Sequence, residues 1–161
     1  MLKPLKIIIL IIAALILQVT ILPAYLSDPF KPNLLIVAVV YIGFKTGDLG
    51  AFPAFALGIL QDCFSGIYLG LNGFSYLCIY FILNLTADRL FTDNRYLMVF
   101  VVFLATLFNG VLNLLLLLLF PPINSIYATI LPDLLPQGLV NALFSTLIFS
   151  FPAVNALVES K

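Results

Sequence analysis

Gly58-Ile-Leu-Gln-Asp62-Cys-Phe-Ser-Gly66-Ile-Tyr-Leu-Gly70 brings a carboxylate to the end of an apolar run. A charge in or near hydrocarbon is costly unless it is paired or hydrated, so Asp62 is expected to have a functional or a specific structural role. Gly50, Ala54 and Gly58 precede it at intervals of four. On a helix these small residues form one stripe that leads to Asp62. The stripe would let another helix approach closely and would place the carboxylate at that contact.

The composition is that of an integral membrane protein. Of the 161 residues 63% are hydrophobic and 9% are charged, and the mean hydropathy is +1.22. Soluble domains are about a quarter charged, so we expect one all-α transmembrane domain over residues 1–161. The seven basic and seven acidic residues cancel, which argues against nucleic-acid binding. Because there is no histidine and no second acid near Asp62, an enzyme, a metal site and a cofactor are not expected.

Charges and prolines divide the chain into apolar runs, which we interpret as six spans in a compact bundle: residues 5–26, 31–45, 49–64, 70–87, 96–120 and 137–157. The second and third runs are short and could instead be one broken span, giving five. The five-span alternative would bury Lys45 in hydrocarbon. With six spans and both termini in the cytoplasm, the positive-inside rule is obeyed, because only Lys31 falls outside. The inside basic residues are then Lys3, Lys6, Lys45, Arg89, Arg95 and Lys161.

Two further features lie towards the C-terminus. The segment 121–136 separates the last two runs, and we expect an outer loop that contains an interfacial turn or short helix. This loop could be a plain connector or could dock a partner. Asn109 and Asn113 are four residues apart on the fifth run and share a helical face. They could hydrogen-bond to neighbouring helices, at about 0.6 kcal/mol each, or line a polar pocket.

Asp62 needs a hydrogen-bond or charge partner. The third run is expected to lead from inside to outside, so Asp62 lies near the C-terminal end of its helix, where the helix dipole disfavours a carboxylate. Lys31 opens the second run at a similar depth, and Pro32 fits as the first helical residue. A Lys31–Asp62 pair would satisfy both charges. In the alternative, Asp62 meets water and headgroups while Lys31 extends to the interface.

The same residues carry a family resemblance. Lys31-Pro32-Asn33-Leu34-Leu35 resembles the basic-Pro-Asp/Asn-Leu-Leu opening of the second span in the MreD family of rod shape-determining proteins. The stretch Gly58-x3-Asp62-x2-Ser65-Gly66-x3-Gly70 is similar to the Gly-x3-Asp…Gly…Gly stretch of that family. Chain length and the six apolar runs agree with the family as well. Asn33 is the neutral variant of a position that is often acidic.

The resemblance implies a non-catalytic, multi-pass protein of the bacterial inner membrane that belongs to the cell-elongation machinery. It would bind MreC, a single-span protein with a large extracytoplasmic domain, and act beside MreB, the RodA glycosyltransferase and a class B penicillin-binding protein. Its role would be to help regulate lateral peptidoglycan synthesis and cell shape, with membrane lipid around it.

The family also resembles, in fold, the substrate-binding S-components of vitamin transporters. The alternative function is therefore a membrane-embedded binding subunit of such a transporter. Asp62, Asn72, Asn113 and Tyr127 are the candidate pocket residues for it.

The six-span topology predicts which positions can be labelled from outside the cell. In a background without Cys63 and Cys78, a membrane-impermeant thiol reagent should label Ser125→Cys and should not label Asp93→Cys. Labelling of position 93 without position 125 would contradict the six-span prediction.

Overall fold

The computed structural model describes residue 9 and residues 12–27, 29–45, 51–65, 68–87, 94–118 and 126–150. Within these residues the chain forms six helices, which confirms the all-α prediction. The first helix, Ile12–Tyr25, contains a π-helical turn η1 followed by a short α2. The elements are η1 (Leu17–Ile21), α2 (Leu22–Tyr25), α3 (Leu34–Lys45), α4 (Phe52–Ser65), α5 (Leu71–Ala87), α6 (Arg95–Leu117) and α7 (Ile126–Ser150).

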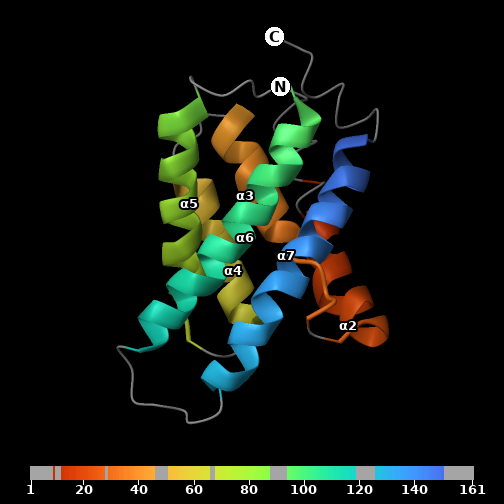
Figure 1. Ribbon diagram of the computed structural model, residues 1–161, viewed down its shortest axis with the longest axis vertical. Coiled ribbons are helices and arrows are strands. Elements are labelled where there is room, and N and C mark those ends of the chain that lie inside the picture. The colour runs from red at the N-terminus through yellow and green to blue at the C-terminus, as the bar shows by residue number, and fades with distance from the viewer. Residues whose placement is uncertain are drawn as a thin grey trace.

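Consecutive helices alternate in direction. Helices α3, α5 and α7 run one way, and α4 and α6 run the other way (Figure 1). By length and composition α6 can cross a membrane alone, whereas the first helix, α3, α4 and α5 are apolar but shorter. The alternation is compatible with six spans, while the orientation in the membrane stays a prediction.

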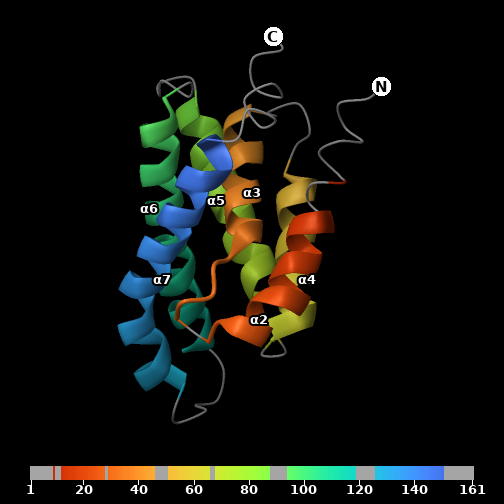
Figure 2. The same cartoon turned by 90° about the vertical axis from the view of Figure 1, so that its right-hand side faces the viewer.

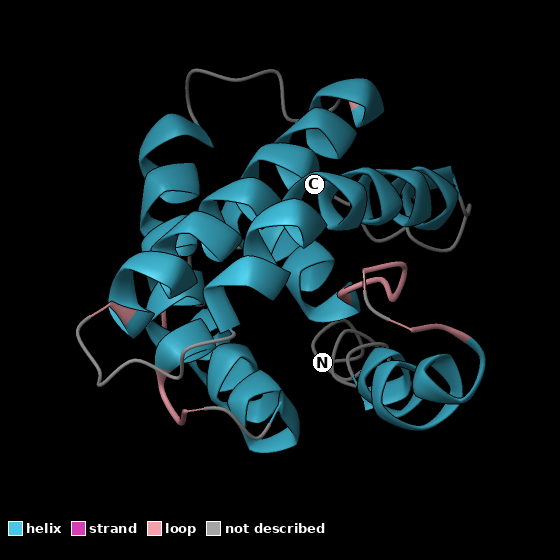
Figure 3. Cartoon of the chain, turned by 60° about the horizontal axis from the view of Figure 1, so that its bottom comes forward, coloured by secondary structure: helices cyan, strands magenta, loops and turns pink. Residues whose placement is uncertain are grey.

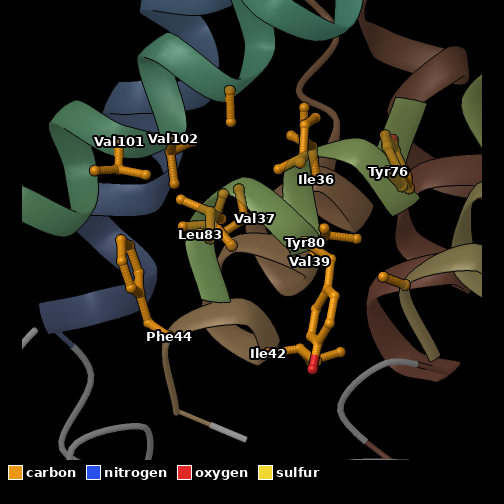
Figure 4. Close-up of a cluster of buried hydrophobic side chains, with 14 of the residues drawn as sticks. Ile36, Val37, Val39, Ile42, Phe44, Tyr76, Tyr80, Leu83, Val101 and Val102 are labelled. Atoms are coloured by element: carbon orange, nitrogen blue, oxygen red, sulfur yellow. The ribbon is translucent and has the colours of Figure 1, made fainter. Parts of the chain in front are cut away.

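Helix α3 is the centre of the bundle. Its sequence is apolar on every side, which is typical of a helix that is buried all round. Ile36, Val39 and Val40 are fully buried. Ile36 and Val39 lie among side chains of α5 and α6 (Figure 4). With 12 residues α3 is about 18 Å long, well short of the roughly 30 Å hydrocarbon core. Figure 2 shows α3 beginning partway along the bundle, so its N-terminus lies in the interior.

Helices α4 and α5 form a close antiparallel pair, which the small-residue stripe makes possible. A Cβ atom added to Gly58 would lie 2.5 Å from the Cα atom of Gly73, so only glycine fits there. Ala54, one turn earlier, is fully buried. The stripe therefore serves a contact inside the chain at Gly58, whereas Gly50 lies outside the described residues.

The sequence predicts an outer loop with a turn or short helix at 121–136, whereas the structure has no separate short helix in its described part, 126–136, which is continuous with the last helix. Helix α7 begins at Ile126 and continues through Pro132 and Pro136, so residues 126–136 are helical. A proline removes one helical hydrogen bond, but membrane helices tolerate it where neighbours support the backbone. Here the Leu134 side chain fills the space that Gly110 of α6 leaves. Residues 121–125 lie outside the described part of the chain.

Replacement of Gly58 by alanine should destabilise the bundle. The added methyl group meets α5 backbone, which cannot move aside, and overpacking of this kind costs about 1–3 kcal/mol. Gly43→Ala is the control, because the three atoms nearest to its new Cβ belong to the Leu83 side chain, the closest at 3.0 Å, and none is backbone. Thermal unfolding in detergent should show the larger loss for Gly58→Ala. Equal losses for the two variants would contradict the close α4–α5 contact.

Candidate functional site

Buried polar side chains gather where α3 and α5 begin. They form two hydrogen-bonded networks within the described residues. The α3 cap network contains Gln18, Asn33, Gln61, Tyr76, Thr106 and Asn141. The Asp62 network contains Asp62, Asn72, Ser75, Asn109 and Asn113.

Gln18 covers the N-terminus of α3 from the first helix. Its Oε1 atom accepts the backbone N–H groups of Leu34 at 2.9 Å and Leu35 at 3.2 Å. Its Nε2 atom donates to Oε1 of Gln61 on α4 at 2.6 Å. Because the first N–H groups of a helix have no partner within the helix, Gln18 supplies acceptors that lipid cannot supply.

Asn33 caps α3 from its own chain position. Its Oδ1 atom accepts the Ile36 N–H at 3.3 Å, which is the usual N-cap bond. Its Nδ2 atom donates to the Tyr76 hydroxyl at 2.8 Å, and its own N–H donates to Oδ1 of Asn141 at 2.7 Å. Asn141 in turn donates to Thr106 of α6. The N-terminus of α3 is thereby tied to α5, α6 and α7.

The prediction that Pro32 is the first helical residue is wrong. Helix α3 begins at Leu34, so Asn33 occupies the capping position and the buried Pro32 precedes it. An asparagine is preferred at the cap because its short side chain reaches back to the helix N–H groups. The Lys31-Pro32-Asn33 motif therefore marks the start of α3, but the helix begins at Leu34, two residues after the predicted position.

Asp62 caps the next helix along the chain. It is 3% exposed, near the end of α4. Its carboxylate accepts the N–H groups of Gly70 at 2.8 Å, Asn72 at 3.0 Å and Gly73 at 3.2 Å. Helix α5 begins at Leu71, so Gly70 occupies its N-cap position. Glycine has no side-chain oxygen, and Asp62 provides the acceptor in its place. Gly70 has φ +102°, a left-handed conformation that suits glycine.

This arrangement supplies the donors that Asp62 required. The positive N-terminal end of the α5 dipole faces the carboxylate and offsets the unfavourable C-terminal end of α4. The sequence pattern indicated the need for donors but not their source, since the donors are backbone groups of another helix. The Lys31–Asp62 pair stays a prediction, and Gly66 lies outside the described residues.

Asn72 extends the Asp62 network to α6. Its Nδ2 atom donates to Asp62 at 2.9 Å, and its Oδ1 atom accepts from Asn113 at 2.9 Å and from Asn109 at 3.3 Å. Ser75 donates to Oδ1 of Asn113 at 2.7 Å. The two asparagines on one face of α6 thus turn towards α5. Among the described side chains, Oδ1 of Asn109 is a buried atom without a hydrogen-bond partner.

These contacts hold helices together. Among the pocket candidates Asp62, Asn72 and Asn113 bond to one another, and the side chain of Tyr127 lies outside the described set. In the part of the chain that the structure describes, no group of three or more metal-ligating side chains comes together. The sequence interpretation overlooked Gln18, although a lone amide inside an otherwise apolar first run was its signal.

Asp62→Asn should destabilise the protein almost as much as Asp62→Ala. An asparagine side chain turns one acceptor oxygen into a donor that faces backbone N–H groups, and a buried unsatisfied donor costs about 1–3 kcal/mol. Asp133→Asn is the matched control, because Asp133 is only partly buried on α7. Thermal unfolding in lipid nanodiscs measures the difference. A wild-type melting temperature for Asp62→Asn would refute the capping role.

Comparison with known proteins identifies the family of the chain. A model of the family described as rod shape-determining protein MreD matches residues 1–158. Neither the curated proteins nor the solved structures gave a match. The match covers nearly the whole chain and therefore includes both capping motifs. The family consists of non-catalytic membrane proteins that determine cell shape. The chain belongs to the MreD family of rod shape-determining membrane proteins.

Proposed function

We propose that the chain is a multi-pass inner-membrane component of the cell-elongation complex that binds an MreC-like single-span protein. Through that contact it helps to regulate lateral peptidoglycan synthesis beside RodA and a class B penicillin-binding protein. Family membership supports the role in shape determination. The specific partner and the regulation are inferences from the family resemblance and from the surface described below.

One observation carries the proposal: most of the buried polar side chains hydrogen-bond to one another, whereas the exposed side chains of α6 and α7 are mainly apolar. The Asp62 and α3 cap networks use their polar groups to join helices of this chain. The large side chains exposed on α6 and α7 are mainly leucine and phenylalanine. Such a surface suits contact with a transmembrane helix through shape and van der Waals packing.

Exposed leucines run along α7, from Leu131 to Leu147, and four exposed leucines lie at the end where α6 stops and α7 starts. Leu115 and Leu118 close α6, and Leu131 and Leu135 open α7, and each is more than half exposed. This is the end that we expect to face outwards, next to the extracytoplasmic domain of an MreC-like protein. We name these four residues the rim leucines and propose them as the contact with the partner span.

Tryptophan substitutions at the rim leucines test the proposal. Leu118→Trp and Leu131→Trp should reduce co-purification of an MreC-like partner while the abundance of the chain stays unchanged. Leu85→Trp is the control, since Leu85 is 76% exposed on α5 and lies near the opposite end of the bundle. Undiminished co-purification with both rim variants would remove the rim leucines as the partner site.

The same purification separates the two candidate functions. If the wild-type chain ignores the single-span partner and instead retains a vitamin-like molecule, the transporter-subunit alternative replaces the proposed one. The bonding of Asp62, Asn72 and Asn113 to one another leaves fewer groups for such a ligand, which favours the partner-binding role.

A further inference from the structure

The first helix stands at the edge of the bundle, and of its described residues Leu15 packs against the hydrophobic core while most others are exposed. Of the residues in Leu17–Tyr25 only Gln18 and Leu22 are buried. Ile12, Ile16 and Ile21 are about half exposed, at 52%, 54% and 46%. Figure 3 shows this helix beside the others, joined to α3 by the loop that follows it. Because lipid solvates apolar side chains as well as protein does, exposed apolar residues do not hold the helix in place.

Gln18 is the specific attachment of the first helix. It bonds to two N–H groups at the start of α3, to Asn33 and to Gln61 of α4. Its amide is 6% exposed and uses both its oxygen and its nitrogen. A single side chain therefore provides most of the polar contact between the first helix and the rest of the described chain.

The attachment lies beside a natural pivot. Gln18 falls in the π-helical turn Leu17–Ile21, where the N–H of Leu22 bonds to the carbonyl of Leu17. Pro23 follows, and it has no N–H to donate to the carbonyl of Val19. The regular hydrogen-bond ladder is interrupted at both points. Interruptions of this kind bend helices and occur often at functional sites.

We propose that the first helix is a lid over the buried N-terminus of α3, that Gln18 latches it, and that it opens by bending at Pro23, which lies after Gln18 in the same helix. Opening separates Oε1 of Gln18 from the N–H groups of Leu34 and Leu35. The open state leaves these N–H groups without an acceptor unless water replaces Gln18, so opening requires that water reaches the start of α3. The remaining bonds from Asn33 and Asn141 keep α3 itself folded.

Distance measurement between spin labels tests the lid. Labels at Ile12→Cys and Leu85→Cys, with Cys63 and Cys78 replaced by alanine, report on the lid and on α5 in lipid nanodiscs. The wild type should give mainly one narrow distance distribution. Gln18→Leu should shift it to a broad distribution with longer distances. An unchanged narrow distribution in Gln18→Leu would overturn the proposal.

Two further variants separate the latch from general loosening. Asn113→Leu removes a polar group of the Asp62 network and should leave the distribution unchanged. Gln61→Leu removes one partner of Gln18 but keeps the bonds to α3, so it should broaden the distribution less than Gln18→Leu does. A second label pair at Leu85 and Leu139, both exposed on α5 and α7, checks that the bundle stays intact.

Amide exchange in the wild type decides the question if Gln18→Leu does not fold. The lid predicts faster hydrogen–deuterium exchange at Leu34 and Leu35 than at Val39 and Val40, because only the first pair depends on Gln18. Uniform protection along α3, together with an unchanged distance distribution in Gln61→Leu, would overturn the proposal.

Discussion

A helix that begins inside a hydrocarbon-wrapped bundle must find acceptors for its first N–H groups, and the rest of this structure depends on how α3 and α5 do so. Lipid offers no hydrogen bonds, so each group left unsatisfied costs several kcal/mol. Gln18, Asn33 and Asn141 serve α3, and Asp62 serves α5. Of the buried polar side chains in the described residues, all but Ser145 belong to the networks at these two starts, where the backbone requires them.

The two caps differ in charge, and their surroundings explain the difference. Asp62 meets four donors, three of them backbone groups at the positive end of a helix dipole, so a carboxylate is well matched there. Asn33 must both accept from Ile36 and donate to Tyr76, which a carboxylate cannot do. A neutral amide at this position therefore fits the network that this chain has built.

Sequence reasoning reached the all-helical class, the family and the importance of Asp62, because these depend on composition and on residues close together in the chain. It did not identify the partner of Asp62, since a helical pattern places a group on a face without saying which neighbouring helix ends there. It separated the segment 121–136, as a loop with a turn or short helix, from the last span because prolines usually interrupt helices. Helix α7 instead continues through Pro132 and Pro136, and Leu134 packs against Gly110. Gln18 was missed because its role depends on two other helices.

Gly58 and Asp62 together join α4 to α5. They lie one turn apart on the same face of α4, so the close approach that Gly58 allows is what brings the carboxylate within reach of the α5 N–H groups. A larger residue at Gly58 would push α5 away and leave both the carboxylate and the helix start unsatisfied. The Gly-x3-Asp motif is thus a joint between two helices. Because Asp62 already accepts four hydrogen bonds there, it serves the architecture of a shape-determining protein and not a reaction.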